Sequence, residues 1–223
     1  MCGRLTESIT RADFMRFFGM EKPGDLPPRF NVAPTQHVVI ITHHPHGRAA
    51  TLARWGLIPP DLTPDDAKRL SLFNARRETL LTKRPFSRPF RRRRCLVPVS
   101  GLYEWHDGQP FHVRRKDGKP LVLAGLWESA FGDEGELLSC TVITTTPNAD
   151  LTALHDRMPV MLLSKDWDAW LDPATPLSDA ERLLEPFAAG VLDVYAVSKD
   201  VGNVRNEGAH LVERLPGNAA TPS

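Results

Sequence analysis

The spacing of hydrophobic residues near the start of the chain is that of an amphipathic helix. Phe14, Phe17 and Phe18 fall on one helical face. Thr10 precedes them, and Asp13 follows it three positions later, as in a capping box that carries Asp in place of Glu. We therefore predict a short helix that ends at about Phe18.

The following segments mix irregular and extended patterns. Residues 19–35 contain four prolines and are predicted to form an ordered but irregular crossing. Val38–Thr42 and Ala50–Trp55 flank a polar tip and predict a pair of strands. Residues 58–67 form a loop rich in Pro and Asp, and Asn74–Thr82 is predicted to be a helix.

Short runs rich in Val, Leu, aromatic residues and Thr predict strands after Arg94. These runs are Cys95–Val99, Leu102–His106, Pro110–Arg115, Pro120–Trp127 and Leu138–Thr145. Asp107-Gly108 and Asp117-Gly118 have the sequence of tight hairpin turns. A helical turn is predicted at Leu151–His155, followed by a strand at Pro159–Leu163. Two helices are predicted at Ser164–Leu171 and Asp179–Phe187, and a last strand at Val191–Val197.

Consecutive hairpins, without regular alternation of strands and helices, predict an α+β fold. We expect a mainly antiparallel, partly closed β-sheet or barrel with a few short helices. A length of 223 residues suits one domain or one and a half, and no linker is long enough to divide the chain. Residues 2–215 are assigned to this domain, and residues 216–223 are predicted to be a disordered tail.

The composition of the chain limits its structural class and its cellular compartment. The chain has 28 Lys and Arg against 27 Asp and Glu, and it is 41% hydrophobic, which excludes disordered, collagen-like and coiled-coil classes. No apolar run reaches the roughly 18–20 residues that span a membrane, and no secretory signal opens the chain. Three cysteines without a CxxC pair predict neither a disulfide framework nor a zinc cluster. We expect a cytoplasmic protein without a membrane partner.

Two further groups of residues are interpreted as non-catalytic. Cys95 and Cys140 lie in apolar strand runs and are read as small buried hydrophobic residues. His43, His44 and His46 occupy the tip of a predicted hairpin and lack accompanying metal-ligand motifs. The sequence therefore predicts no metal site and no cofactor.

The positive charge is concentrated in one segment. Residues 83–94 read KRPFSRPFRRRR, with seven cations in twelve residues and no acid. A solvated surface fits this run, and so does a face that contacts an anionic polymer. Two Pro-Phe pairs indicate packing, and the planar guanidinium of Arg can hold two phosphate oxygens at once.

Cys2 has a position with distinct chemistry. It directly follows the initiator Met, and a small second residue normally permits removal of that Met, so we expect Cys2 to become the N-terminal residue. Its α-amine, with a pKa of about 7.7–8.0, and its thiol, with a pKa of about 8.5, would then stand on adjacent carbons. Such a 1,2-aminothiol can form a Schiff base with an aldehyde and close it to a thiazolidine.

Eight short motifs follow one another along the chain. They are Met1-Cys2-Gly3-Arg4, Phe30-Asn31-Val32-Ala33-Pro34, Trp55-Gly56-Leu57-Ile58-Pro59, Asn74-Ala75-Arg76-Arg77-Glu78-Thr79, Gly101-Leu102-Tyr103-Glu104-Trp105, Thr144-Thr145-Thr146-Pro147-Asn148, His155-Asp156-Arg157-Met158-Pro159 and Val201-Gly202-Asn203-Val204. In this order they closely resemble the SRAP family, the SOS response-associated peptidase domain of abasic site processing proteins. The resemblance covers about residues 2–213.

The resemblance implies a protein that binds single-stranded DNA at an abasic site and cross-links itself to the exposed sugar aldehyde. By this likeness Cys2 is the nucleophile, and Asn74 orients the N-terminal residue or the sugar. Glu104 is the general acid and base, and His155 is the pocket histidine. Both of these groups fit chemistry in which a sugar ring opens and a hydroxyl leaves as water.

The same resemblance implies a set of DNA-binding residues. Arg4, Arg76 and Arg84 correspond to phosphate ligands beside the lesion, and Asn31 and Pro34 to pocket framework. Family members commonly carry an aromatic residue shortly after the WGLIP segment. This chain has none before Phe73, and Leu62 is the apolar side chain available as a wedge, although it offers no stacking face.

Three functions are compatible with these residues. The first is a DNA-repair protein that forms a covalent thiazolidine with abasic sites in single-stranded DNA, with associated lyase activity through the Schiff base. The second is an N-terminal-cysteine peptidase that uses Cys2, Asn74 and Glu104. The third is a non-catalytic reader of damaged DNA. A monomer suffices for each of them.

Overall fold

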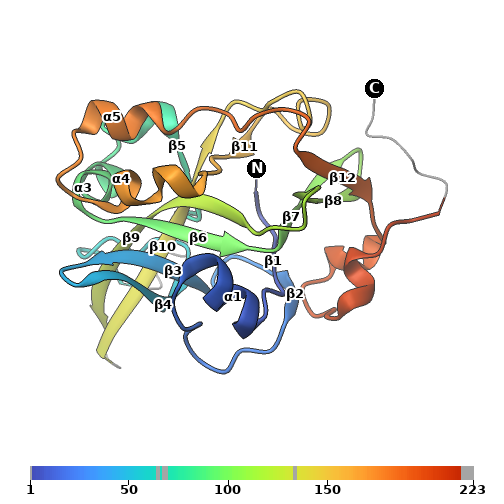
Figure 1. Ribbon diagram of the computed structural model, residues 1–223, viewed down its shortest axis with the longest axis horizontal. Helices are drawn as coiled ribbons and strands as arrows, with labels where there is room; N and C mark the ends of the chain where they lie inside the picture. The colour runs from blue at the N-terminus through green and yellow to red at the C-terminus, as the bar shows by residue number, and fades with distance from the viewer. Residues whose placement is uncertain (1, 64–65, 67–69, 133–134, 217–223) are drawn as a thin grey trace.

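The computed structural model describes residues 2–63, 66, 70–132 and 135–216 and shows two β-sheets with short helices around them (Figure 1). The strands are β1 (Leu5–Glu7), β2 (Arg29–Val32), β3 (His37–His44), β4 (Gly47–Trp55), β5 (Asn74–Arg76), β6 (Arg94–Val99), β7 (Gly101–His106), β8 (Gln109–Arg115), β9 (Leu121–Gly132), β10 (Gly135–Thr145), β11 (Met158–Pro159) and β12 (Leu192–Ala196). The α-helices are α1 (Arg11–Phe18), α3 (Arg84–Arg92), α4 (Trp167–Leu171) and α5 (Leu177–Arg182). Single 3-10 turns occupy Arg77–Thr79, Ser164–Asp166, Lys199–Gly202 and Ala209–Val212.

Five strands of the larger sheet close into a barrel. β3 pairs with β4 and β6, β9 pairs with β6 and β10, and β10 returns to β4. The β4–β10 contact is parallel, and the other four contacts are antiparallel. The predicted α+β fold on a mainly antiparallel barrel is confirmed, and closure of the barrel is complete.

Side-chain alternation along the barrel strands separates an inner core from an outer one. Val38 and Ile40 of β3 belong to the inner cluster, whereas Val39 and Ile41 pack in the cluster that contains the helices. Helices α1, α3 and α4 contribute aromatic side chains to this outer cluster, namely Phe14, Phe18, Phe86, Phe90, Trp167 and Trp170. The helices therefore cover the outside of the barrel.

The second sheet has the strand order β12-β8-β7-β1-β2 and extends the inner core. Leu5 of β1 and Leu102 of β7 lie opposite each other and join the inner cluster. Cys95 and Cys140 belong to the same cluster and are fully buried free thiols, which confirms their interpretation as small core residues. This sheet carries the N-terminal segment toward the site described below.

The helix predictions succeeded where the signals were local. The Thr10 side chain accepts a hydrogen bond from Asp13 N at 3.0 Å, and Gly19 ends α1 in the left-handed region at φ 68°. In the basic segment, Phe86 and Phe90 are buried as expected. The segment folds as helix α3 from Arg84, a structure that its prolines did not suggest.

Three predictions were wrong, each because a distant partner decides the local structure. Residues 19–35 contain strand β2, which pairs with β1. Asn74–Thr82 is not an α-helix, because its first residues pair with β10 as β5 and a 3-10 turn follows. Asp117 and Gly118 form a turn, but it joins β8 to β9 of the other sheet and closes no hairpin.

The C-terminal elements match the predictions in place more than in length. β12 confirms the last strand, and Trp167 and Trp170 lie on a short helical segment as predicted. Helix α5 ends at Arg182, five residues before Phe187, and β11 is limited to Met158–Pro159. After Pro216, the predicted tail lies outside the described residues.

Arg94 gives the basic segment a structural anchor. Its guanidinium is buried and donates to three backbone oxygens, at 2.8 Å to Phe90 O and also to Trp170 O and Asp172 O. We expect Arg94→Ala to lower the free energy of unfolding by about 2–4 kcal/mol, because the carbonyl groups of the buried Phe90 and Trp170 and of the half-buried Asp172 lose their donor. Urea denaturation measures this change.

Arg92→Ala is the matched control, because Arg92 is exposed at the end of α3, two residues before Arg94. Its substitution should change the free energy of unfolding by less than about 0.5 kcal/mol. Equal effects of the two substitutions would show that the carbonyl contacts of Arg94 contribute no net stability.

Among the described residues, no helix is long and apolar enough to cross a membrane. Over the same ranges, His, Cys, Asp and Glu form no group of three that could hold a metal ion. His43, His44 and His46 are exposed around the β3–β4 turn.

Candidate active site and nucleic-acid interface

Cys2 lies at the start of the segment that leads into β1. Tyr103 N donates to Arg4 O at 3.0 Å, so this segment runs beside β7 toward Glu104. The Cys2 side chain is fully buried. Burial raises the pKa of its thiol, and the Glu104 carboxylate acts in the same direction, which indicates that the two groups are neighbours.

Glu104 is an acid held inside the protein. It lies in β7 opposite Phe111 of β8 and is 2% exposed. Burial raises its pKa to about 7, and the carboxylate of Asp156 adds to this effect. A carboxyl group with this pKa exists in both protonation states near neutral pH, which suits a general acid and base.

Asn74 connects β5 to the N-terminal segment. Its Nδ2 donates to the carbonyl oxygen of Cys2 at 2.7 Å. Its Oδ1 is buried and accepts no hydrogen bond from the residues that the structure describes. A buried amide oxygen in this state is ready to accept an N–H or O–H group brought by a ligand.

His155 lies at the end of a single helical turn that begins at Leu151. His155 N donates to Leu151 O at 3.1 Å, and the backbone N–H of Arg157 donates to His155 Nδ1 at 3.0 Å. Asp156 Oδ1 lies 2.7 Å from the same Nδ1. Burial lowers the pKa of His155, and the Asp156 carboxylate acts in the opposite direction. The Asp156 carboxylate raises the pKa of Glu104, so the loop that carries His155 and Asp156 lies within electrostatic reach of that acid.

An ion pair between the buried Arg157 and the exposed Glu78 holds the His155 loop. Arg157 donates to both carboxylate oxygens of Glu78, at 2.7 and 2.9 Å, and to Thr144 O at 2.6 Å. Hydrogen bonds from Arg157 lower the pKa of Glu78. Both residues belong to motifs noted in the sequence, but nothing in their spacing indicates that they form a pair.

Arg4 and Asn31 form a framework behind the N-terminal segment. Arg4 Nη1 donates to Asn31 Oδ1 at 2.5 Å and to Val201 O at 2.7 Å, and the guanidinium lies 5.7 Å from the centroid of the Trp105 ring. Asn31 is buried and donates to the carbonyls of Asn203 and Asn206. Asn31 and the half-buried Arg4, which was predicted as a phosphate ligand, are both held by internal hydrogen bonds.

The remaining predicted DNA-binding residues are more accessible. Arg76 is exposed at the end of β5, two residues after Asn74, and Pro34 is half-buried just after β2. The side chain of Arg84 is 86% exposed at the start of α3 and pairs with Asp61 at 2.9 Å. Arg76 therefore lies nearest in the chain to the buried groups.

Leu62 and Arg84 share a groove of about 580 Å³. Pro59, Pro60, Asp61, Leu70, Pro85, Ser87, Arg88, Pro89 and Glu128 also line it. Leu62 is half-buried in a turn closed by its N–H to Pro59 O at 3.0 Å. The groove thus places an apolar side chain beside exposed guanidinium groups, and helix α3 supplies Arg88, which sequence reasoning did not single out.

Together these residues supply proton-transfer groups around a thiol. A protonated thiol, an acid that titrates near pH 7, an open amide acceptor and a neutral imidazole surround the N-terminal segment. Such a set can add a nucleophile to a carbonyl group and remove the resulting hydroxyl as water. It does not resemble a metal-ligand set.

Comparison with known proteins places this chain in a family. The sequence model described as SOS response associated peptidase (SRAP) matches residues 1–204. The chain belongs to this family. Within the SRAP match lie Cys2, Asn74, Glu104 and His155, together with the groove residues.

Curated relatives and a solved structure extend the SRAP match over nearly the whole chain. The abasic site processing protein YoqW of Bacillus subtilis is 34% identical and covers 96% of this chain and 99% of its own length. The abasic site processing protein YedK of Escherichia coli is 30% identical with the same coverage. A crystal structure of a Bacteroides thetaiotaomicron protein superposes with a TM-score of 0.85 at 26% identity, covering 96% of this chain and 100% of that chain.

Proposed function

We propose that this protein processes abasic sites in single-stranded DNA and cross-links to them through Cys2 after Met1 is removed. The observation that carries the proposal is the placement of Glu104, with a pKa of about 7, beside the Cys2 thiol. The names of the SRAP relatives YoqW and YedK, both abasic site processing proteins, support the substrate. An abasic sugar supplies the aldehyde that a 1,2-aminothiol captures.

The first chemical step joins nitrogen to carbon. The neutral α-amine of Cys2 adds to the aldehyde carbon and forms a carbinolamine. Glu104 donates its proton to the carbinolamine hydroxyl, which leaves as water, and a C=N bond remains. The open Oδ1 of Asn74 can accept a hydrogen bond from the amine or from a sugar hydroxyl during this step.

The second step closes the ring. The thiol holds its proton at neutral pH because burial raises its pKa, so it needs a base. The Glu104 carboxylate left by the first step accepts that proton while sulfur bonds to the iminium carbon. The product is a five-membered thiazolidine, one water has been released, and Glu104 is protonated again.

His155 has a different role in this scheme. It lies on the loop that is fixed by the pair between Arg157 and Glu78, and Asp156 of this loop raises the pKa of Glu104. We assign it proton transfer in opening the sugar and in strand cleavage through the Schiff base. Because thiazolidine closure uses Glu104, the final adduct depends less on His155.

Arg76 and Arg84 are proposed to bind phosphates. Both are exposed, and neither has a buried internal role. Arg76→Ala and Arg84→Ala should each weaken binding to all single-stranded sequences similarly and lower the salt slope by about 0.7 per lost contact. Fluorescence anisotropy of labelled oligonucleotides over a salt series measures both quantities.

Arg11→Ala controls for loss of one exposed guanidinium elsewhere, on helix α1. It should leave the salt slope unchanged. If Arg76→Ala or Arg84→Ala alters sequence preference at an unchanged salt slope, the residue reads bases and the phosphate assignment is wrong.

One incubation separates this function from a peptidase and from a non-catalytic reader. Purified protein is mixed with single strands that carry either an abasic site or an intact base, and products are resolved under denaturing conditions. Cross-linking predicts an adduct only with the abasic strand. Salt-sensitive binding without an adduct supports a reader, and cleavage of a peptide substrate without an adduct supports a peptidase.

A further inference from the structure

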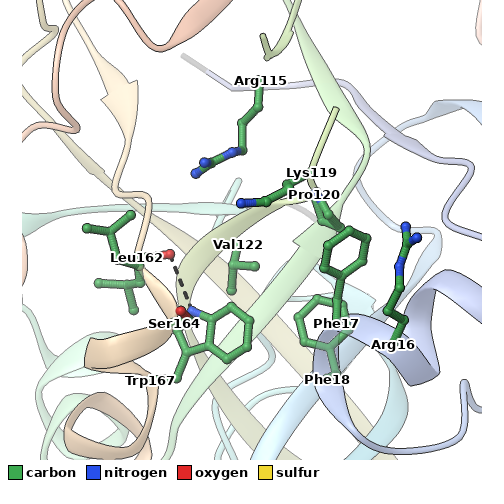
Figure 2. Close-up of a pocket in the computed structure, with 11 residues that line it drawn as sticks. Arg16, Phe17, Phe18, Arg115, Lys119, Pro120, Val122, Leu162, Ser164 and Trp167 are labelled. Atoms are coloured by element: carbon green, nitrogen blue, oxygen red, sulfur yellow. Dashed lines mark hydrogen bonds between the residues drawn. The ribbon is translucent and has the colours of Figure 1, made fainter. Parts of the chain in front are cut away.

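A second pocket lies away from the Cys2 site, between helix α1, the β8–β9 connection and α4 (Figure 2). Its volume is about 350 Å³. It is lined by Arg16, Phe17, Phe18, Arg115, Lys119, Pro120, Val122, Leu162, Leu163, Ser164 and Trp167. None of these residues belongs to the proposed DNA site. A ligand of this pocket is therefore distinct from the DNA strand that Cys2 is proposed to cross-link.

The floor of the pocket is apolar and rigid. Phe18 and Trp167 stack with ring centroids 5.2 Å apart and an interplanar angle of 27°, and both are buried. Trp167 Nε1 donates to Leu162 O at 3.3 Å, the contact marked in Figure 2. Because these rings are covered by each other, they leave little open ring face for a nucleic-acid base, whereas their edges and Val122 can contact an inserted side chain.

The upper wall carries an excess of positive charge. Arg115 donates to both oxygens of Asp117, at 2.8 and 2.7 Å, and Lys119 Nζ lies 3.6 Å from Asp117 Oδ2. One carboxylate therefore serves two cations. Figure 2 shows the Arg115 and Lys119 side chains above the apolar floor. No carboxylate lines the pocket within the described residues.

Arg16 extends this positive charge to the rim. Its guanidinium lies 4.7 Å from the centroid of the Phe17 ring and pairs with Asp13 at 2.6 Å. Its side chain is 68% exposed, so a ligand that passes the rim can contact it. Lys119, at 61% exposure, is the cation best placed to exchange its distant carboxylate for a ligand.

The volume of the pocket limits the kind of anionic ligand that it can hold. A volume of 350 Å³ lies near the lower limit of small-ligand sites, about 300–1,000 Å³, and suits one amino-acid residue. The C-terminal residue of a peptide carries a side chain and a carboxylate on the same carbon. An aromatic C-terminal residue therefore matches an apolar floor that faces a lysine across one small cavity.

We propose that this pocket binds the C-terminal end of an acidic peptide segment of a partner protein, with a terminal aromatic residue. The aromatic side chain occupies the floor beside Trp167 and Val122, and the terminal carboxylate pairs with Lys119. Acidic residues that precede it pass the rim near Arg16. This proposal does not rest on the function assigned to Cys2.

The test uses a fluorescein-labelled acidic peptide that ends in Phe with a free carboxylate, titrated with full-length protein by anisotropy. Saturable binding is expected. An otherwise identical peptide with a C-terminal amide, and another that ends in Ala, should each bind at least about tenfold more weakly, because one loses the charged contact and the other the apolar contact.

Lys119→Glu should weaken binding of the Phe-terminated peptide by about tenfold or more, while abasic-site processing keeps its native rate. Lys199→Glu makes the same charge change at an exposed residue that does not line the pocket, and it should stay within about twofold of the native affinity. Circular dichroism confirms that both variants fold. Three results would overturn the proposal: no saturation up to about 1 mM protein, equal binding of the amidated and free peptides, or full displacement of the peptide by a single-stranded oligonucleotide.

Discussion

Cys2→Ala is expected to abolish the denaturation-resistant adduct with abasic single-stranded DNA. The substitution leaves an α-amine that can form a Schiff base, but no sulfur remains to close the thiazolidine. Without that ring the C=N bond hydrolyses, so only borohydride reduction should trap a weak adduct. Denaturing gels of reactions with and without borohydride measure the two products.

Cys140→Ala is the matched control, because Cys140 is also a fully buried free thiol but lies within strand β10 and not at the N-terminus. Its adduct yield should equal that of the native protein once folding is verified. An additional residue that stays in front of Cys2 should prevent the reaction, since it converts the amine into an amide. A stable adduct at native yield from Cys2→Ala would identify another nucleophile.

Glu104→Gln is expected to slow cross-linking by about 10²–10⁴-fold. Glutamine keeps the shape and the hydrogen-bonding capacity of the side chain, but it can neither donate a proton to the departing hydroxyl nor accept one from the thiol. Binding to intact single strands should change little, because Glu104 is buried in β7 and makes no exposed contact for a phosphate. A quench-flow time course of adduct formation, with anisotropy for binding, measures the two effects separately.

The pH dependence provides a second readout for Glu104. Its acid form, which donates the proton, predominates below a pKa of about 7 and is lost above it. The α-amine must instead be neutral, a form that increases as pH rises through about 7.7–8.0. The native rate should therefore follow a bell-shaped profile between pH 5 and 9, and Glu104→Gln should lose the alkaline fall. Cross-linking at the native rate by Glu104→Gln would show that this carboxyl group is structural.

His155→Ala should keep the bell-shaped pH profile of adduct formation, while it slows strand cleavage.

Local signals explain which parts of the fold were predictable. The cap formed by Thr10 and Asp13 determines α1 from adjacent residues. Strand β5 exists because Asn74 lies opposite Val142 of β10, and no pattern within residues 74–82 contains that information. In α3, Pro89 obscured a helix whose buried face is formed by Phe86 and Phe90.

The candidate site was likewise predictable only in part. Cys2, Asn74, Glu104 and His155 stand in short motifs, so their residue types could be identified from the sequence. The contacts between them depend on how β1, β5 and β7 pair with their neighbours. The run of arginines at residues 91–94 shows the limit of composition, because it combines exposed side chains with the fully internal Arg94.

The most direct test of the account is mass spectrometry of the cross-linked protein. The mature chain should weigh one methionine less than the 223-residue sequence. After reaction with an abasic strand and digestion, the sugar should be found on the N-terminal peptide, at Cys2, with the mass that corresponds to loss of one water. Efficient cross-linking by protein that retains Met1, or attachment of the sugar to a lysine, would contradict the proposed chemistry.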